Sequence, residues 1–201
     1  MEAFRNHIKQ LINGESIELF KFDFKKGERK LSGEKISLKP ENIIIVEGIH
    51  AFNPKLLEGM NIETFNVYVS CLTQLNINRV NRIPTRDVRL LRRIFRDTRF
   101  RGYSAENTLK QWESVKVGEE QYIFPFQERA DRMFNSSLVY ELAVLKNFLE
   151  TPLRCVEINS PFYCEALRLL NFLEHFLSIR EDEIPPTSIL REFIGGSTFY
   201  Y

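Results

Sequence analysis

The sequence predicts an α/β fold with a mainly parallel sheet. The first observation is the run Ile43–Val46, four β-branched apolar residues in a row, which suits a strand buried on both faces of a parallel sheet. The second is a pair of further segments with strand character, residues 65–71 and 130–138. The third is that segments with helical periodicity lie between and after these strands, as in α/β proteins.

Length, composition and charge limit the classes of function. The chain has 201 residues, enough for one α/β domain or for one domain with an appendage. Its net charge of +1 argues against a nucleic acid or a membrane surface as partner, so any basic site must be a local cluster. No apolar run approaches the roughly 20 residues of a membrane span, and the polar first ten residues are not a signal peptide. The three cysteines form no C-x-x-C motif, which indicates reduced thiols in a cytoplasmic protein.

The first elements are a helix and a hairpin. Apolar residues recur every three or four positions over Phe4–Ile12, which predicts an amphipathic helix, and Asn13-Gly14 is a typical helix end. Residues 16–24 and 33–38 then predict two strands of a β-hairpin with a long or irregular connection. The hairpin is too polar for the centre of a sheet, so we expect it at an edge or over a cleft.

The end of the buried strand predicts a ligand site. Glu47 and Gly48 follow the strand at once, and ligands in α/β folds bind beyond the carboxyl ends of parallel strands. A carboxylate at this place often holds Mg²⁺ through water. The alternative is a core strand that ends in a solvated glutamate. After the loop, Pro54 to Leu57 predicts one helical turn, since proline is favoured at the first helical position.

The segment Thr85–Arg101 is unusually rich in arginine. An apolar stripe at helical spacing predicts a helix that Thr85 or Asp87 can cap. One interpretation is a solvated basic face. Such a face usually also carries lysine, however, and this one has none, whereas arginine is favoured where planar contacts to phosphate are needed. The segment therefore predicts anion binding. Its arginines are Arg86, Arg89, Arg92, Arg93, Arg96, Arg99 and Arg101.

The rest of the chain is mostly helical. The pair Arg101-Gly102 breaks the arginine-rich helix, and a second helix runs from about Ser104 to Gly118, an arrangement that suits a mobile lid. The later expectations are a helix over 138–148 ended by Thr151-Pro152, a short strand over 154–158, and helices over 162–179 and 187–193. We expect a first domain over residues 1–150 and a helical extension over residues 151–201.

Several of these motifs together resemble the uridine kinase and phosphoribulokinase family. They are Val46–Ala51, Arg92–Asp97, Arg101–Ser104 and Ile123–Gln127. The resemblance covers residues 1–150 and implies a partial P-loop kinase fold, a three-layer α/β/α arrangement with a hairpin excursion and a helical arginine-rich lid. It also implies transfer of the γ-phosphate of ATP, with Mg²⁺, to the 5′-hydroxyl of a nucleoside such as uridine or cytidine.

The resemblance also implies roles for single residues. Glu47 corresponds to the acid that holds the metal and takes part in catalysis, and Arg93, Arg96 and Arg101 correspond to lid arginines that bind ATP phosphates, the first two as catalytic residues. Phe22, Arg29 and Gln111 correspond to positions that border the nucleoside. Two departures concern nucleoside specificity: Gly27 stands where many uridine kinases have histidine, and Tyr103 stands where many have a second arginine.

The chain lacks other parts of the family pattern. It contains no G-x-x-x-x-G-K-[ST] motif, and the family's P-loop and catalytic aspartate would precede Met1. We therefore expect a kinase-like domain without its first two strands, inactive by itself. Strand edges left open would lead either to direct pairing of 43–47 with 65–70 or to a homo-oligomer. The alternative function is a non-catalytic nucleotide-binding or regulatory module. RNA binding is disfavoured, because aromatic residues are not interleaved with the arginines.

Overall fold

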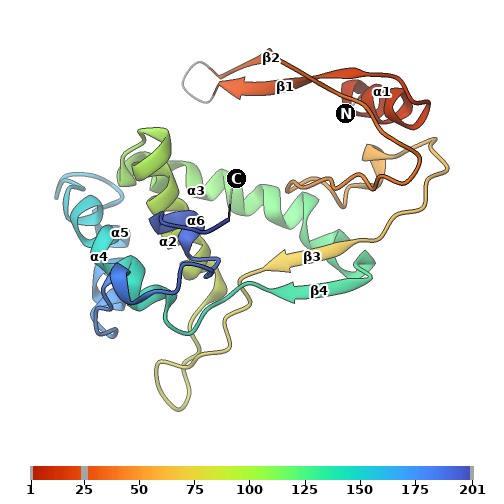
Figure 1. The fold of residues 1–201 in the computed structure, drawn as a ribbon. Coiled ribbons are helices and arrows are strands. Elements are labelled where there is room, and N and C mark those ends of the chain that lie inside the picture. The colour runs from red at the N-terminus through yellow and green to blue at the C-terminus, as the bar shows by residue number, and fades with distance from the viewer. Residues whose placement is uncertain (1, 24–26, 200–201) are drawn as a thin grey trace. The chain divides into compact units, whose positions relative to one another are not determined.

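A computed structural model describes residues 2–23 and 27–199 as a mixed α/β chain (Figure 1). It divides into two compact units, the first formed by Met1–Tyr68 and Val117–Arg132 and the second by Val69–Lys116 and Met133–Tyr201. The strands are β1 Ile17–Asp23, β2 Glu28–Ile36, β3 Val67–Ser70 and β4 Arg132–Asn135. The helices are α1 Glu2–Ile12, α2 Thr85–Arg96, α3 Ala105–Tyr122, α4 Glu141–Arg154, α5 Tyr163–Leu173 and α6 Arg191–Ile194, with short turns at Pro54–Leu56, Asp97–Arg101, Phe124–Arg129 and Glu181–Glu183.

The first unit contains the predicted helix and hairpin, but the second strand begins at Glu28 instead of residue 33, so the connection is shorter than predicted. Helix α1 buries Ile8 and Leu11 on one face. Strands β1 and β2 are antiparallel, and their register is irregular between Glu18 and Phe20. Of the connecting residues 24–27, residues 24–26 lie outside the described residues. The predicted turn after the Glu47 loop is present as a 3-10 turn that begins at Pro54.

Strands β3 and β4 form a parallel pair. The Arg132 N–H donates to the Asn66 carbonyl (3.2 Å), and the Ser136 N–H donates to the Ser70 carbonyl (2.8 Å). Because later residues of one strand bond later residues of the other, the two strands run in the same direction (Figure 1). The strands predicted over 65–71 and 130–138 are therefore present, although each is shorter than predicted.

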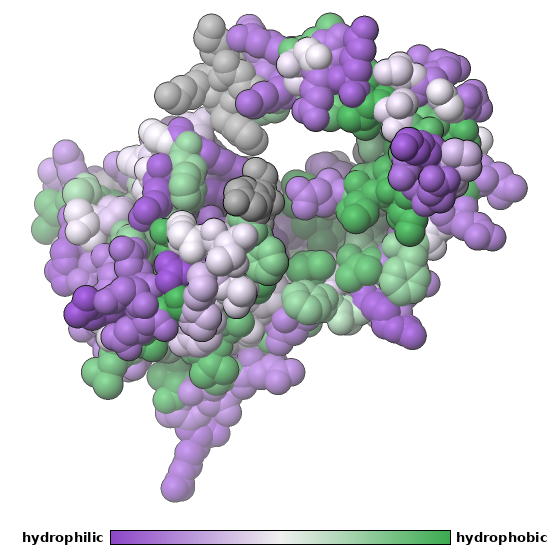
Figure 2. Space-filling view, viewed as in Figure 1, coloured by the Kyte–Doolittle hydropathy of each residue, from purple (hydrophilic) through white to green (hydrophobic). Residues whose placement is uncertain are grey.

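The strand predicted over residues 43–47 is wrong. This segment is irregular, and Ile43 and Ile45 are 87% and 90% exposed. A parallel strand is stable only beside hydrogen-bonded neighbours. Within the described residues β3 pairs with β4, so the expected pairing of 43–47 with 65–70 is also wrong. Apolar residues consequently reach the surface, as the space-filling view illustrates for one face of the molecule (Figure 2).

The second unit has a helical hydrophobic core. Helix α4 packs against α2 and α5, and the Phe95 ring of α2 meets the ring of Phe148 edge-on at a centroid distance of 5.3 Å. Two expectations fail here. Pro152 lies inside α4 and does not end it, and the strand expected over 154–158 is instead the end of α4 and a turn. Cys155 continues the helical bonding, since its N–H donates to the Thr151 carbonyl at 3.1 Å.

The break between α2 and α3 is confirmed. A π-helical turn over Asp97–Arg101 ends at Gly102, whose φ of 71° is left-handed and whose N–H donates to the Asp97 carbonyl. The Ser104 hydroxyl accepts the Asn107 N–H (3.2 Å) and caps α3, which begins close to the predicted position. Helix α2, by contrast, follows Pro84 and has no side-chain cap, so the predicted capping by Thr85 or Asp87 is wrong.

Two further observations concern the described part of the chain. None of its helices is long and apolar enough to cross a membrane. Its cysteines are free thiols: Cys71 is buried, whereas Cys155 and Cys164 are exposed.

Two glycine substitutions should have opposite effects on stability. Gly102→Ala places a Cβ in a left-handed conformation, which costs about 1–2 kcal/mol of unfolding free energy. Gly118→Ala, inside α3, should raise that free energy by about 0.5–1 kcal/mol, because alanine is the better helix former. A Cβ at either position meets no atom within 4 Å, so the pair isolates the backbone effect. Urea unfolding followed by far-UV circular dichroism measures both, and shifts of the same sign would contradict the assigned conformations.

Candidate functional site

The candidate site is an arginine cluster built around Asp97, where α2 passes into the π-helical turn. The Asp97 carboxylate is 2% exposed. Its Oδ2 lies 3.3 Å from Nε of Arg93, and its Oδ1 accepts a hydrogen bond from Arg101 at 2.9 Å. The Thr108 hydroxyl of α3 donates to the same carboxylate at 3.1 Å. Both arginines lie four residues from Asp97, a spacing that brings side chains together on a helix face.

Arg93 connects this cluster to α3. Its guanidinium donates to the Gln111 side chain at 3.3 Å. Its Nε is buried and makes an ion pair with Asp97 without a hydrogen bond of good geometry, so this N–H has no acceptor among the described residues. A buried donor in this state favours a ligand that supplies the acceptor. The structure thus brings together three predicted residues, Arg93, Arg101 and Gln111.

Arg96 is the arginine of the cluster that lacks a fixed partner. Within the described part of the chain its guanidinium makes no hydrogen bond and no ion pair. Arg96 is exposed, yet partial burial of its guanidinium lowers its pKa, and repulsion from Arg101 and Arg93 lowers it further, against the attraction of Asp97 and Glu192. Two guanidinium groups, those of Arg93 and Arg101, share the buried Asp97 carboxylate, and Arg96 adds a third positive charge, so the cluster keeps an excess of positive charge. An anion bound beside Arg96 would relieve that repulsion.

Other arginines of the segment serve packing. Arg92 makes a two-bond ion pair with Glu141 of α4, at 2.9 and 2.6 Å, and donates to the Ser136 carbonyl at 2.8 Å. The guanidinium carbon of Arg99 lies 5.3 Å from the ring centroid of Phe148. The predicted basic flank is therefore not uniform, because some of its arginines bind the helices of the core.

The hairpin residues lie in the first unit. Phe22 and Arg29 are opposite each other in the register of β1 and β2, and Phe22 is exposed. The guanidinium of Arg29 lies 4.3 Å from the ring centroid of Phe20, and the His7 ring stacks on that same ring at 5.2 Å. Arg29 is thus held by a cation–π contact inside the hairpin. A nucleoside role for Phe22 and Arg29 stays a prediction.

Glu47 also belongs to the first unit, in the irregular segment, with its side chain exposed. Among the described residues no group of three or more His, Cys, Asp and Glu side chains is arranged to hold a metal ion. A single carboxylate nevertheless fits Mg²⁺, because this ion usually takes one or two carboxylates together with waters and substrate phosphates. The metal and catalytic roles of Glu47 stay predictions.

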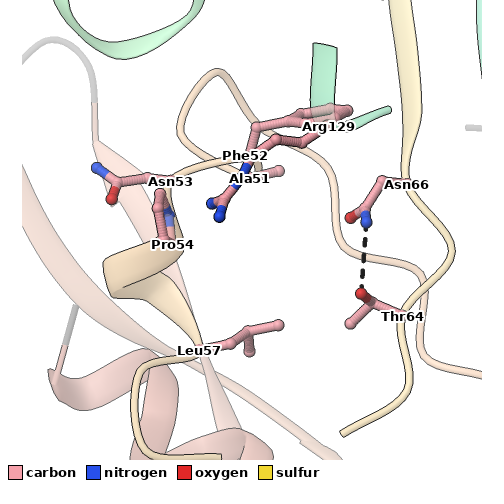
Figure 3. A pocket seen from close by; sticks show the side chains of 8 residues that line it. All are labelled: Ala51, Phe52, Asn53, Pro54, Leu57, Thr64, Asn66 and Arg129. Carbon is pink, nitrogen blue, oxygen red and sulfur yellow. Dashed lines mark hydrogen bonds between the residues drawn. The ribbon is translucent and has the colours of Figure 1, made fainter. Parts of the chain in front are cut away.

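The first unit contains a cavity that the sequence did not indicate. It has a volume of about 330 Å³, and its lining includes one charged side chain, Arg129 (Figure 3). A hydrogen bond of 3.4 Å joins the Asn66 amide to the Thr64 hydroxyl at its wall. The lining residues are Ala51, Phe52, Asn53, Pro54, Leu57, Thr64, Asn66 and Arg129. None of the predicted site residues is among them.

Comparison with known proteins gives the family. The model of the phosphoribulokinase / uridine kinase family matches residues 1–142. The chain therefore belongs to this family, as the motifs indicated.

Similar proteins carry the name uridine kinase. The Halobacterium salinarum protein is 34% identical over 131 residues, which is 65% of this chain and 51% of that protein. The Staphylococcus haemolyticus protein is 34% identical over 126 residues, 62% of this chain and 53% of that protein. The Bacillus pumilus protein is 34% identical over the same length, 62% of this chain and 52% of that protein. The chain spans about half the length of the curated relatives it matches.

The residue that sequence reasoning missed is Asp97. In the sequence it is only the last residue of the Arg92–Asp97 motif, whereas the structure places it at the centre of the cluster. The signal was present, since Arg93, Asp97 and Arg101 follow one another at intervals of four residues.

Neutralising this carboxylate should destabilise the second unit. Asp97→Asn leaves Arg93 and Arg101 with a neutral partner, and we expect the free energy of unfolding to fall by about 1–3 kcal/mol. Asp182→Asn is the control, because Asp182 and its partner Arg180 are both exposed, and its effect should stay within about 0.5 kcal/mol. Urea unfolding of the two variants in parallel makes the comparison. Equal effects would contradict the central role of Asp97.

Proposed function

We propose that the chain provides the phosphate-binding lid and the nucleoside-side hairpin of a nucleoside kinase, which transfers the γ-phosphate of ATP to a nucleoside 5′-hydroxyl. Membership of the phosphoribulokinase / uridine kinase family supports a nucleoside kinase-like function. The uridine kinases among its relatives make uridine, or the related cytidine, the first substrates to test.

The observation that carries the proposal is the state of Arg96. Its guanidinium has no fixed partner in the described residues and lies in a cluster with excess positive charge. A polyphosphate offers several anionic oxygens, and guanidinium groups bind such oxygens through short, charge-assisted hydrogen bonds. Phosphoryl transfer depends mainly on positioning and on neutralising the charge of the transferred group. An arginine cluster of this kind suits that task.

The proposal gives each residue a separate task. Arg93, Arg96 and Arg101 bind phosphate oxygens of ATP, and Glu47 holds Mg²⁺ through water. Mg²⁺, when bound, neutralises part of the charge on the phosphates. Phe22, Arg29 and Gln111 border the nucleoside.

The alternative is a non-catalytic nucleotide-binding module. It would use the same arginine cluster without transferring phosphate, so measurements of turnover must separate it from the kinase.

Removing Arg96 should weaken ATP binding to this chain. Arg96→Ala removes charge-assisted hydrogen bonds worth about 1.5–3 kcal/mol, so we expect Kd to rise about tenfold or more. Arg180→Ala is the matched control, because Arg180 is an exposed arginine whose carboxylate partner is its near neighbour Asp182. Isothermal titration calorimetry at low and high salt measures both variants. Equal affinities in the two variants would contradict phosphate binding by the cluster.

The purified chain should not transfer phosphate by itself. Its 201 residues contain no G-x-x-x-x-G-K-[ST] sequence, and P-loop kinases need the backbone cradle that this motif forms around the ATP phosphates. We therefore expect the purified chain to bind ATP without phosphorylating uridine or cytidine above background. A nucleoside phosphorylation assay over successive purification steps tests this. Turnover that co-purifies with the chain would contradict the expected inactivity and would exclude the non-catalytic module.

A further inference from the structure

The C-terminal segment of the second unit, residues 181–195, packs onto the arginine-rich helix α2. The Phe193 ring of α6 meets the Phe95 ring of α2 at a centroid distance of 5.9 Å, and the guanidinium carbon of Arg92 lies 5.7 Å from the centroid of Phe193. Leu190 and Ile194, on either side, are 1% and 4% exposed. This segment lies beyond residue 142, where the match to the family ends.

Further contacts fix the backbone of the segment. The guanidinium of Arg191 donates to the carbonyls of Glu181 (2.9 Å), Gly195 (3.2 Å) and Ile184. The Ser188 hydroxyl is hydrogen-bonded to the hydroxyl of Tyr140 at 2.9 Å. The residues next to these anchors are therefore held at defined places relative to α2.

Glu192 is one such residue, and its charge acts on the candidate site. It lies between Arg191 and Phe193, its side chain is exposed, and within the described residues its carboxylate makes no ion pair. Burial lowers the pKa of Arg96, and the Glu192 carboxylate works against that lowering. Phe193 and Phe95, whose rings contact each other at 5.9 Å, are the chain neighbours of Glu192 and Arg96, so the two charged residues lie at the contact between α6 and α2. There the carboxylate also attracts the guanidinium of Arg92.

We propose that Glu192 is a built-in counter-charge that sets the affinity of the arginine cluster for a polyphosphate ligand. The inference rests on the proposed function, because it assumes that phosphate binds beside Arg96. A polyphosphate approaching Arg96 meets the negative charge of Glu192, which repels it. The carboxylate offsets part of the positive charge when no ligand is bound, and it weakens binding when one is present.

The probe is inorganic tripolyphosphate, which has no nucleoside and reports on the phosphate site alone. We expect Glu192→Gln to tighten its binding to the 201-residue chain about two- to fivefold at low ionic strength, the range for one exposed charge pair. Glu183→Gln is the matched control, since Glu183 is an exposed glutamate of the same segment, and should leave Kd unchanged. Salt should reduce the difference between the variants, because screening weakens interactions between exposed charges.

The variants separate failure of this inference from failure of the proposed function. If Arg96→Ala weakens binding and Glu192→Gln matches the wild type, the counter-charge is refuted and the phosphate site stands. Equal tightening by Glu192→Gln and Glu183→Gln would refute a specific role and indicate a general effect of net charge. If neither Arg96→Ala nor Glu192→Gln changes the Kd for tripolyphosphate, both proposals fail. Both also fail if the wild type and the variants do not bind tripolyphosphate at all. The melting temperature of Glu192→Gln should stay near that of the wild type, because the side chain is exposed, whereas a structural role would move it.

Discussion

The second unit depends on the burial of one carboxylate among arginines. Asp97 accepts from Arg101 and Thr108 and forms an ion pair with Arg93, while its carbonyl accepts the Tyr103 N–H at 3.1 Å. One residue therefore joins the end of α2, the π-helical turn and the start of α3. A buried carboxylate is stable only when charged partners and hydrogen bonds compensate its lost hydration. The arginines supply that compensation, and the carboxylate in turn reduces their mutual repulsion.

How much of the fold was predictable depends on whether the determining contacts are local. Helix α1, the hairpin and the helix break at Gly102 follow from spacing and turn residues, and all of them are present. The run Ile43–Val46 has strong strand character, yet a strand needs a neighbour, and its own residues do not say which one. Pro152 fails as a stop signal because the surrounding residues of α4 are buried in the core.

The distinction between local contacts and contacts with distant residues also applies to the candidate site. The neighbourhood of Arg93 and Arg101 is set by helical spacing around Asp97, so sequence motifs could place these residues together. Arg92 carries an identical side chain one position away, but its partner Glu141 lies on α4, 49 residues later in the chain. No periodicity within α2 distinguishes an arginine that binds the core from one that faces a ligand. That difference arises only when the helices pack.

The two carboxylates that act on Arg96 differ in burial, and this gives them different physical effects. Asp97 is almost completely removed from water, so its attraction to the arginines is weakly screened and is tied to folding. Glu192 is exposed, so water and salt screen its charge, and its removal affects folding little. Arg96 stays protonated in either case, so Asp97 acts on its position and on folding, whereas Glu192 acts at the surface that an anion would approach.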